Sequence, residues 1–178
     1  NTDNQLSSNL ATQVFQDKSG FIWIATRNGL NNYDGYHINV IKKDMSNFLS
    51  LNSNYINSIA QDEKEHILLG TYNSLLEFTG SEFLKIPMLD SKGEELATYV
   101  KQVYPLRNKD VAVATSGYGI MLKKQDEQKC HAMKGEVEKL KYIHKLLEDK
   151  RGRLWIITED GKLYRKETNG RVTSHFAG

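Results

Sequence analysis

Four segments of the chain share one pattern, a short apolar run that ends in a threonine and is followed by a polar turn. The runs read FIWIAT, ILLGT, VAVAT and LWIIT, and they end at Thr26, Thr71, Thr115 and Thr158. The threonines are 45, 44 and 43 residues apart. The first and last runs are apolar at consecutive positions, which is typical of a strand that is buried on both faces. Such a regular period indicates a repeat architecture.

Each repeat contains signals for four short strands. An apolar segment precedes every run (ATQVFQ, YINSIAQ, YVKQVYPL and YIHKLLE), and two further short strands follow it. The pairs Asn28-Gly29 and Asp160-Gly161 favour tight hairpin turns, because these residues tolerate positive φ. Four strands in a period of about 40–45 residues are typical of a β-propeller blade. We expect an all-β chain whose single domain, 1–178, holds four four-stranded antiparallel blades at residues 9–43, 54–87, 98–133 and 141–176.

Four blades are fewer than most propellers with repeats of this length contain. A ring of seven such repeats needs roughly 310 residues, so we expect the chain to form part of a seven-bladed propeller. Because the sequence begins at Asn1 rather than Met, we also expect that a signal peptide or a tag preceded it. With only part of the ring present, the apolar outer faces of the first and last blades would be uncovered. This predicts contact with the remaining blades of a parent propeller, or self-association through the open faces.

Composition and motifs exclude several classes of function. The net charge is only +2, and no run of Lys and Arg indicates nucleic-acid binding. No apolar run approaches the roughly 20 residues of a membrane-spanning helix, and the single cysteine cannot form an internal disulfide. The five histidines show no metal-ligand spacing, and no nucleophile motif is present. We therefore expect no catalytic residues, no metal and no cofactor.

The turns between the second and third strands are the best candidates for a ligand site. They share one end of a propeller with the segments that enter each blade, and binding residues are common on loops held by a rigid scaffold. Amide, guanidinium and aromatic groups there would suit a sugar. Asn28 and Asp160 are equally explained as turn formers, and Trp23 and Trp155 as packing between blades. The candidate residues are Arg27, Asn28, Tyr72, Asn73, Ser116, Tyr118, Glu159 and Asp160.

Three segments carry a resemblance to a known family. LSSNLATQVFQDKSGFIWIATRNGLNNYDG resembles the two-component regulator propeller repeat, and SLNSNYINSIAQDEKEHILLGT and LLEDKRGRLWIITEDGKLYR resemble degenerate copies of it. The resemblance implies a non-enzymatic part of the periplasmic sensor region of a hybrid two-component histidine kinase, anchored in the inner membrane of a polysaccharide-degrading gut bacterium. Such a region detects an oligosaccharide from a glycan and regulates the genes for its use.

Two other functions remain open at this point, because the same fold hosts all three. A protein–protein interaction scaffold of the WD40 type would carry Gly-His and Trp-Asp pairs in each repeat, and these are absent at the right offsets. A carbohydrate-active propeller enzyme, a lyase or a sialidase, would place catalytic residues at the centre. The turn from Asp17 to Trp23 is similar to the Asp box of sialidases, but one extra residue separates Asp17 from Gly20. We interpret it as a structural turn.

Overall fold

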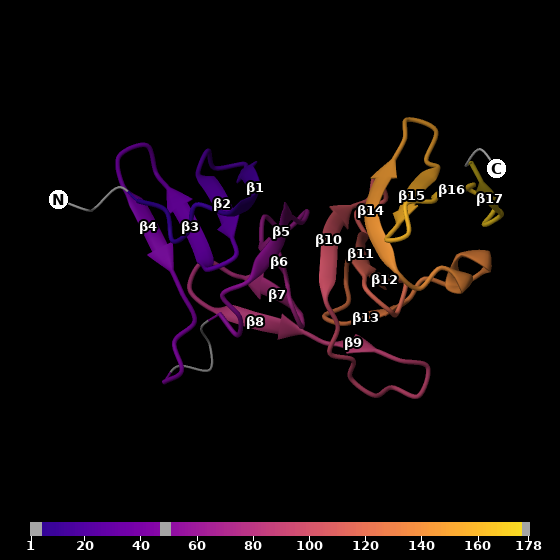
Figure 1. The fold of residues 1–178 in the computed structure, drawn as a ribbon, viewed down its shortest axis with the longest axis horizontal. Coiled ribbons are helices and arrows are strands. Elements are labelled where there is room, and N and C mark those ends of the chain that lie inside the picture. The colour runs from indigo at the N-terminus through magenta and orange to yellow at the C-terminus, as the bar shows by residue number, and fades with distance from the viewer. Residues whose placement is uncertain (1–4, 47–50, 176–178) are drawn as a thin grey trace.

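The computed structural model describes residues 5–46 and 51–175 and contains four β-sheets that lie side by side in chain order (Figure 1). The four antiparallel strands of each blade fall in the stretches 11–41, 56–86, 100–132 and 143–174, and Phe176, where the last expected range ends, lies outside the described residues. Blade 1 consists of β1 (Ala11–Gln16), β2 (Ile22–Thr26), β3 (Gly29–Tyr33) and β4 (Ile38–Ile41). Blade 2 consists of β5 (Ile56–Gln61), β6 (Ile67–Thr71), β7 (Leu75–Phe78) and β8 (Phe83–Ile86).

Blades 3 and 4 repeat this antiparallel order, with one addition. Blade 3 consists of β10 (Val100–Pro105), β11 (Val111–Thr115), β12 (Ile120–Lys123) and β13 (Cys130–Ala132). Blade 4 consists of β14 (Ile143–Glu148), β15 (Leu154–Thr158), β16 (Leu163–Lys166) and β17 (Val172–Ser174). The addition is β9 (Met88–Leu89), which pairs in parallel with the edge strand β13. The all-β propeller architecture expected from the repeat is thus confirmed.

A β-bulge near the start of the first strand recurs in every blade, between Ala11 and Gln13 in blade 1 and at the equivalent positions in the others. The side chain that follows the bulge reaches the backbone of the next blade. Gln13 both accepts from the backbone N–H of Ile59 and donates to its carbonyl, each over 2.9 Å. Gln102 accepts from the N–H of Leu146 in the same way, over 2.6 Å. These contacts fix the spacing of neighbouring blades.

Apolar residues fill the three spaces between neighbouring blades. Trp23 of β2 lies in the space between blades 1 and 2, where its ring meets Phe78 edge-on at 5.6 Å. The expectation that Trp23 packs between blades is therefore confirmed. Trp155 occupies the equivalent position in β15, but it is only half-buried, and the guanidinium groups of Arg153 and Arg165 lie over its ring.

The same aspartate–tryptophan hydrogen bond closes the turn between the first two strands in blades 1 and 4. Asp17 accepts hydrogen bonds from the backbone N–H of Phe21 and from Nε1 of Trp23. Asp149 accepts in the same way from Nε1 of Trp155, and this bond holds the pKa of the Asp149 carboxyl well below its usual range. Asp17 thus has the structural role expected from the sequence.

The chain leaves the sheets mainly in two places. Residues 87–96 form an excursion between blades 2 and 3 that includes β9, and η1 (Glu136–Lys139), a single turn of 3₁₀-helix, precedes blade 4. Within residues 5–46 and 51–175, the structure has no helix with the length and apolar character needed to cross a bilayer.

Candidate functional site

One end of the blade assembly brings two kinds of segment together. The turns between the second and third strands lie against the residues that lead into the first strand of each blade. The N–H groups of Arg27, Ser116 and Glu159 donate to the carbonyls of Leu10, Tyr99 and Tyr142 over 3.2, 3.0 and 2.9 Å. All eight candidate residues therefore lie at this end.

A cluster of three tyrosines marks the middle of this end. Tyr55 and Tyr99 immediately precede β5 and β10, and Tyr72 lies in the turn between β6 and β7. Their ring centroids are 6.1 Å (Tyr55 to Tyr72), 5.9 Å (Tyr55 to Tyr99) and 5.3 Å (Tyr72 to Tyr99) apart. Contacts of this kind stabilise aromatic groups beyond the area they bury. The cluster joins blade 2 to blade 3 and leaves Tyr72 62% exposed.

Tyr55 and Tyr99 were missed by the sequence prediction, although the sequence contains a signal for them. Leu10, Tyr55, Tyr99 and Tyr142 occupy one repeat position, immediately before the first strand of each blade, with intervals of 45, 44 and 43 residues. Three of these four positions hold tyrosine. An aromatic residue that recurs outside the buried strands points to a surface role more directly than the turn residues do.

Two cations lie over the tyrosine rings. The guanidinium of Arg27 is 5.6 Å from the centroid of Tyr55, and Nζ of Lys101 is 4.6 Å from that of Tyr99. Both arrangements are favourable, because an aromatic face carries negative charge. Lys101 also pairs with the Glu159 carboxylate over 3.4 Å. A continuous line of contacts therefore runs from blade 1 to blade 4.

Positive charge gathers beside Lys101. His144 and Lys145 are the second and third residues of β14, and the pKa of each is lowered, first by burial and then by the Lys101 ammonium. Burial and the neighbouring Tyr55 raise the pKa of the Tyr99 hydroxyl, which therefore stays protonated at neutral pH. The site thus offers hydroxyl donors and ammonium groups with one paired carboxylate.

A pocket of about 280 Å³ lies between blades 2 and 3, next to the tyrosine cluster. Its walls combine phenol rings with hydroxyl and amide groups, which is the composition expected for a small polar ligand. Tyr72 and Tyr118 have the most exposed rings around it. The residues that line it include Tyr72, Asn73, Thr98, Tyr99, Ser116 and Tyr118.

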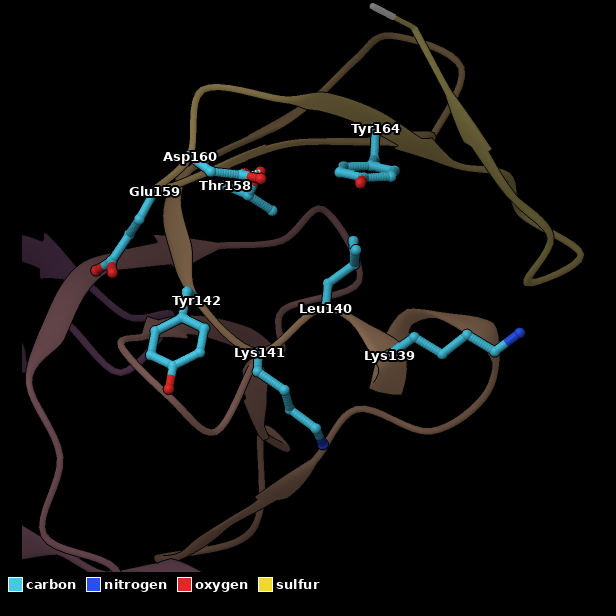
Figure 2. Close-up of a pocket in the computed structure, with 8 residues that line it drawn as sticks. All are labelled: Lys139, Leu140, Lys141, Tyr142, Thr158, Glu159, Asp160 and Tyr164. Atoms are coloured by element: carbon cyan, nitrogen blue, oxygen red, sulfur yellow. Dashed lines mark hydrogen bonds between the residues drawn. The ribbon is translucent and has the colours of Figure 1, made fainter.

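A second pocket, of about 480 Å³, lies between blade 4 and the segment that leads into it (Figure 2). Leu140 and Tyr164 point toward each other across it, whereas the charged ends of Lys139 and Glu159 point away. Tyr142 and Asp160 also line this pocket. The two pockets together contain six of the eight candidate residues.

Four of the eight candidate residues take part in hydrogen bonds within the turns themselves. The backbone N–H groups of Asn28, Asn73 and Tyr118 donate to the hydroxyls of the preceding threonines, which leaves the ring of Tyr118 free for a ligand. Asp160 accepts from the Thr158 hydroxyl over 2.6 Å and pairs with Lys162, and these bonds lower the pKa of its carboxyl. The turn-forming role that the sequence allowed for Asn28 and Asp160 is therefore present. Arg27, Tyr72, Ser116, Tyr118 and Glu159 remain the better candidates for ligand contacts.

The opposite end of blade 2 holds a group that the histidine spacing did not indicate. Asp62, His66 and Glu77 place their side-chain donor atoms within 4.8 Å of one another. Asp62 and His66 belong to the turn after β5, and Glu77 lies on β7. The pairing of β6 with β7 brings them together, so no local spacing could reveal the group.

Comparisons with known proteins agree with this architecture. The family model described as "Two component regulator propeller" matches residues 5–28, 50–73 and 139–160. The extracellular domain of the putative hybrid two-component system BT4673 from B. thetaiotaomicron superposes with a TM-score of 0.79 at 18% identity, over 94% of this chain and 25% of that one. The corresponding domain of BT3049 from the same organism gives 0.72 at 20% identity, over 93% and 23%. No curated protein matches the sequence.

An enzyme with the same fold is also similar. Virginiamycin B lyase from Staphylococcus aureus superposes with a TM-score of 0.70 at 11% identity, over 93% of this chain and 55% of the lyase. At these identities the superpositions show the fold alone. The chain spans about a quarter of the length of the two-component structures. The family matches fall in blades 1, 2 and 4, where the sequence carries the resemblance, and these three segments are similar to the two-component regulator propeller repeat.

Proposed function

We propose that this chain is a ligand-recognition part of the extracellular sensor region of a hybrid two-component system, and that it binds an oligosaccharide. The binding surface, which we call the tyrosine face, consists of Arg27, Tyr55, Tyr72, Tyr99, Ser116, Tyr118 and Glu159. The observation that carries the proposal is the tyrosine cluster, which has an exposed ring and a polar pocket beside it. The three matches to the two-component regulator propeller model and the similarity to extracellular domains of two-component systems support the sensor role.

The chemistry of the tyrosine face suits a sugar. A sugar ring presents C–H groups on its faces and hydroxyls around its edge. Tyr72 and Tyr118 supply flat apolar faces at the pocket of about 280 Å³, and Ser116 and Asn73 supply hydrogen-bonding groups beside them. Arg27 and Lys101 are held in place by the rings they cover, so little side-chain freedom is lost when a ligand binds.

The state of the carboxylates favours binding over catalysis. A general acid at neutral pH needs a raised pKa, whereas the pKa of Asp160 is lowered by its hydroxyl and ammonium partners. Glu159 is paired with Lys101. We therefore propose that the tyrosine face recognises its ligand without transforming it. Its location would be the periplasm, on a protein anchored in the inner membrane, with further blades completing the ring.

Calorimetry tests this proposal. Oligosaccharides from different glycans are titrated into the extracellular region that contains this chain, and then into Tyr72→Ala. Loss of the exposed ring should weaken binding of the recognised sugar by about tenfold or more, which is about 1.4 kcal/mol. Tyr36→Ala is the matched control, because Tyr36 is 83% exposed in blade 1 and lies outside the tyrosine face. If the Tyr72 variant bound as the unchanged protein does, the proposed site would be wrong.

A further inference from the structure

Blade 2 contains a compact group of two acids and one histidine at the end opposite the tyrosine face. His66 Nδ1 lies 2.5 Å from Glu77 Oε1 and 4.0 Å from Asp62 Oδ2. The side chains of Asp62 and Glu77 are only 7% and 3% exposed, whereas that of His66 is 32% exposed. The group is therefore closed on the protein side and open to solvent along the imidazole.

The charges in this group do not balance. Two buried carboxylates face one imidazole, which carries at most one positive charge. Burying a carboxylate is costly unless it is paired and hydrogen-bonded. Glu77 has the imidazole as its partner, but Asp62 Oδ2 has only the 4.0 Å contact, which is too long for a hydrogen bond. Oδ1 of Asp62 accepts from the backbone N–H of His66 over 2.9 Å, whereas Oδ2 faces the imidazole without a hydrogen-bond donor from the described residues.

The repeat shows what is missing. In blades 1 and 4 the equivalent aspartate oxygen accepts from the indole N–H of Trp23 or Trp155. In blade 2 the tryptophan position holds Leu68, which has no donor. In blade 4, Arg153 and Arg165 stand at the positions of His66 and Glu77. Compared with blade 4, blade 2 therefore lacks the indole donor and both arginines, and it has one histidine and a second carboxylate at these positions.

We propose that Asp62, His66 and Glu77 bind a divalent transition-metal ion, with Zn²⁺ as the best fit. One imidazole nitrogen and two carboxylate oxygens are a donor set that suits Zn²⁺, whereas Ca²⁺ and Mg²⁺ prefer oxygen ligands alone. The exposed side of His66 leaves room for a water as the fourth ligand. The ion neutralises both acids and ties the turn after β5 to β7, as the indole bond ties the corresponding turn in blades 1 and 4.

The distances between the three ligand atoms need only small adjustments to fit around a zinc ion. Ligand atoms about 2.0–2.2 Å from a tetrahedral zinc ion are roughly 3.4 Å apart. The His66–Glu77 separation is shorter than this and the His66–Asp62 separation is longer. Rotation of the His66 ring away from Glu77 and toward Asp62 moves both in the required direction, and the partly exposed ring has space to rotate.

Zinc binding to the metal-free protein is the test. The protein is dialysed against a chelator, and Zn²⁺ is then added while bound metal is measured by equilibrium dialysis with elemental analysis. We expect one ion per chain, a raised melting temperature, and loss of this stoichiometric binding in both His66→Gln and Glu77→Gln. His37→Gln is the matched control, since His37 also lies 4.0 Å from an aspartate, Asp34, but is largely exposed. It should bind zinc as the unchanged protein does.

Two results would overturn the proposal: absence of stoichiometric zinc binding by the unchanged protein, or full binding by His66→Gln. If the variants do not fold, as far-ultraviolet circular dichroism will show, X-ray absorption of zinc on the unchanged protein decides instead. One imidazole with oxygen ligands supports the site, and a shell with no nitrogen or with several imidazoles contradicts it. Zinc binding is independent of sugar binding, so failure here leaves the function of the tyrosine face unaffected.

Discussion

Trp23 donates from its indole Nε1 to Oδ2 of Asp17 over 2.8 Å, which ties a buried strand of blade 1 to the turn that precedes it. Blade 4 repeats the bond between Trp155 and Asp149. In blade 3 both positions are apolar, Leu106 and Ala112, so donor and acceptor are lost together. The hydrogen bond therefore fixes the turn between the first two strands only in those blades that carry both residues, and the sequence shows which blades these are.

Removing the indole donor should destabilise blade 1. Trp23→Phe keeps an aromatic ring beside Phe78 but leaves Asp17 Oδ2 without its donor. A hydrogen bond to a charged group contributes about 1.5–3 kcal/mol, and we expect a loss of this size in the free energy of unfolding measured with urea. Phe21→Leu, in the same turn, is the control and should change stability less. Equal stabilities for Trp23→Phe and the unchanged protein would show that the bond contributes nothing.

Low pH should weaken the corresponding hydrogen bond in blade 4, between Trp155 and Asp149. The pKa of Asp149 is lowered from 3.8 in the folded protein, chiefly by the hydrogen bond from Trp155. As pH falls, the unfolded chain binds the proton first, so the stability that this carboxylate provides is present above pH 3.8 and is lost below it. Asp149→Asn lacks this dependence. The difference in unfolding free energy between the two proteins should therefore shrink as the pH is lowered from 6 to 3, and a constant difference would contradict the assignment.

The sequence was sufficient for the architecture. The period of the buried second strands located all four blades, because a strand that is covered on both faces must be apolar throughout. The strand β9 was not predicted, since two residues that pair in parallel with a distant edge strand leave no periodic pattern. The single 3₁₀ turn Glu136–Lys139 was not predicted either, since four residues between two blades leave no periodic pattern.

The sites were less predictable than the fold. The turn residues could be assigned to one end, because their position in the repeat determines it. Tyr55 and Tyr99 were visible as a recurring position but were treated as parts of strands. The group of Asp62, His66 and Glu77 depends on the pairing of β6 with β7 and on burial, and neither can be obtained from spacing.

Close packing between blades 2 and 3 leaves no room for a side chain at Gly70. A Cβ there would lie 2.6 Å from Cγ1 of Val100, which is less than a normal contact distance. Gly70→Ala should therefore lower the unfolding free energy by about 1–3 kcal/mol. Adding Val100→Ala removes the opposing methyl groups, so the double variant should recover part of the loss relative to the sum of the single variants. Purely additive effects would argue against direct contact.

The outer face of blade 4 is expected to mediate association of the isolated chain. Leu147, Trp155, Ile157 and Leu163 line a groove of about 220 Å³ there, and residues at their repeat positions in blades 1 to 3 pack against a following blade. Light scattering should show concentration-dependent self-association, and Leu147→Lys should suppress it. Met45→Lys, at another exposed apolar residue, is the control. A chain that stays monomeric at high concentration would contradict this prediction.

The location of the bound ligand tests the central claim most directly. A crystal structure of the extracellular region that contains this chain, with the oligosaccharide identified by calorimetry, would show it. We predict a sugar ring against Tyr72 or Tyr118, with hydroxyls hydrogen-bonded around the pocket between blades 2 and 3. A ligand bound elsewhere, with the tyrosine face open to solvent, would contradict the account.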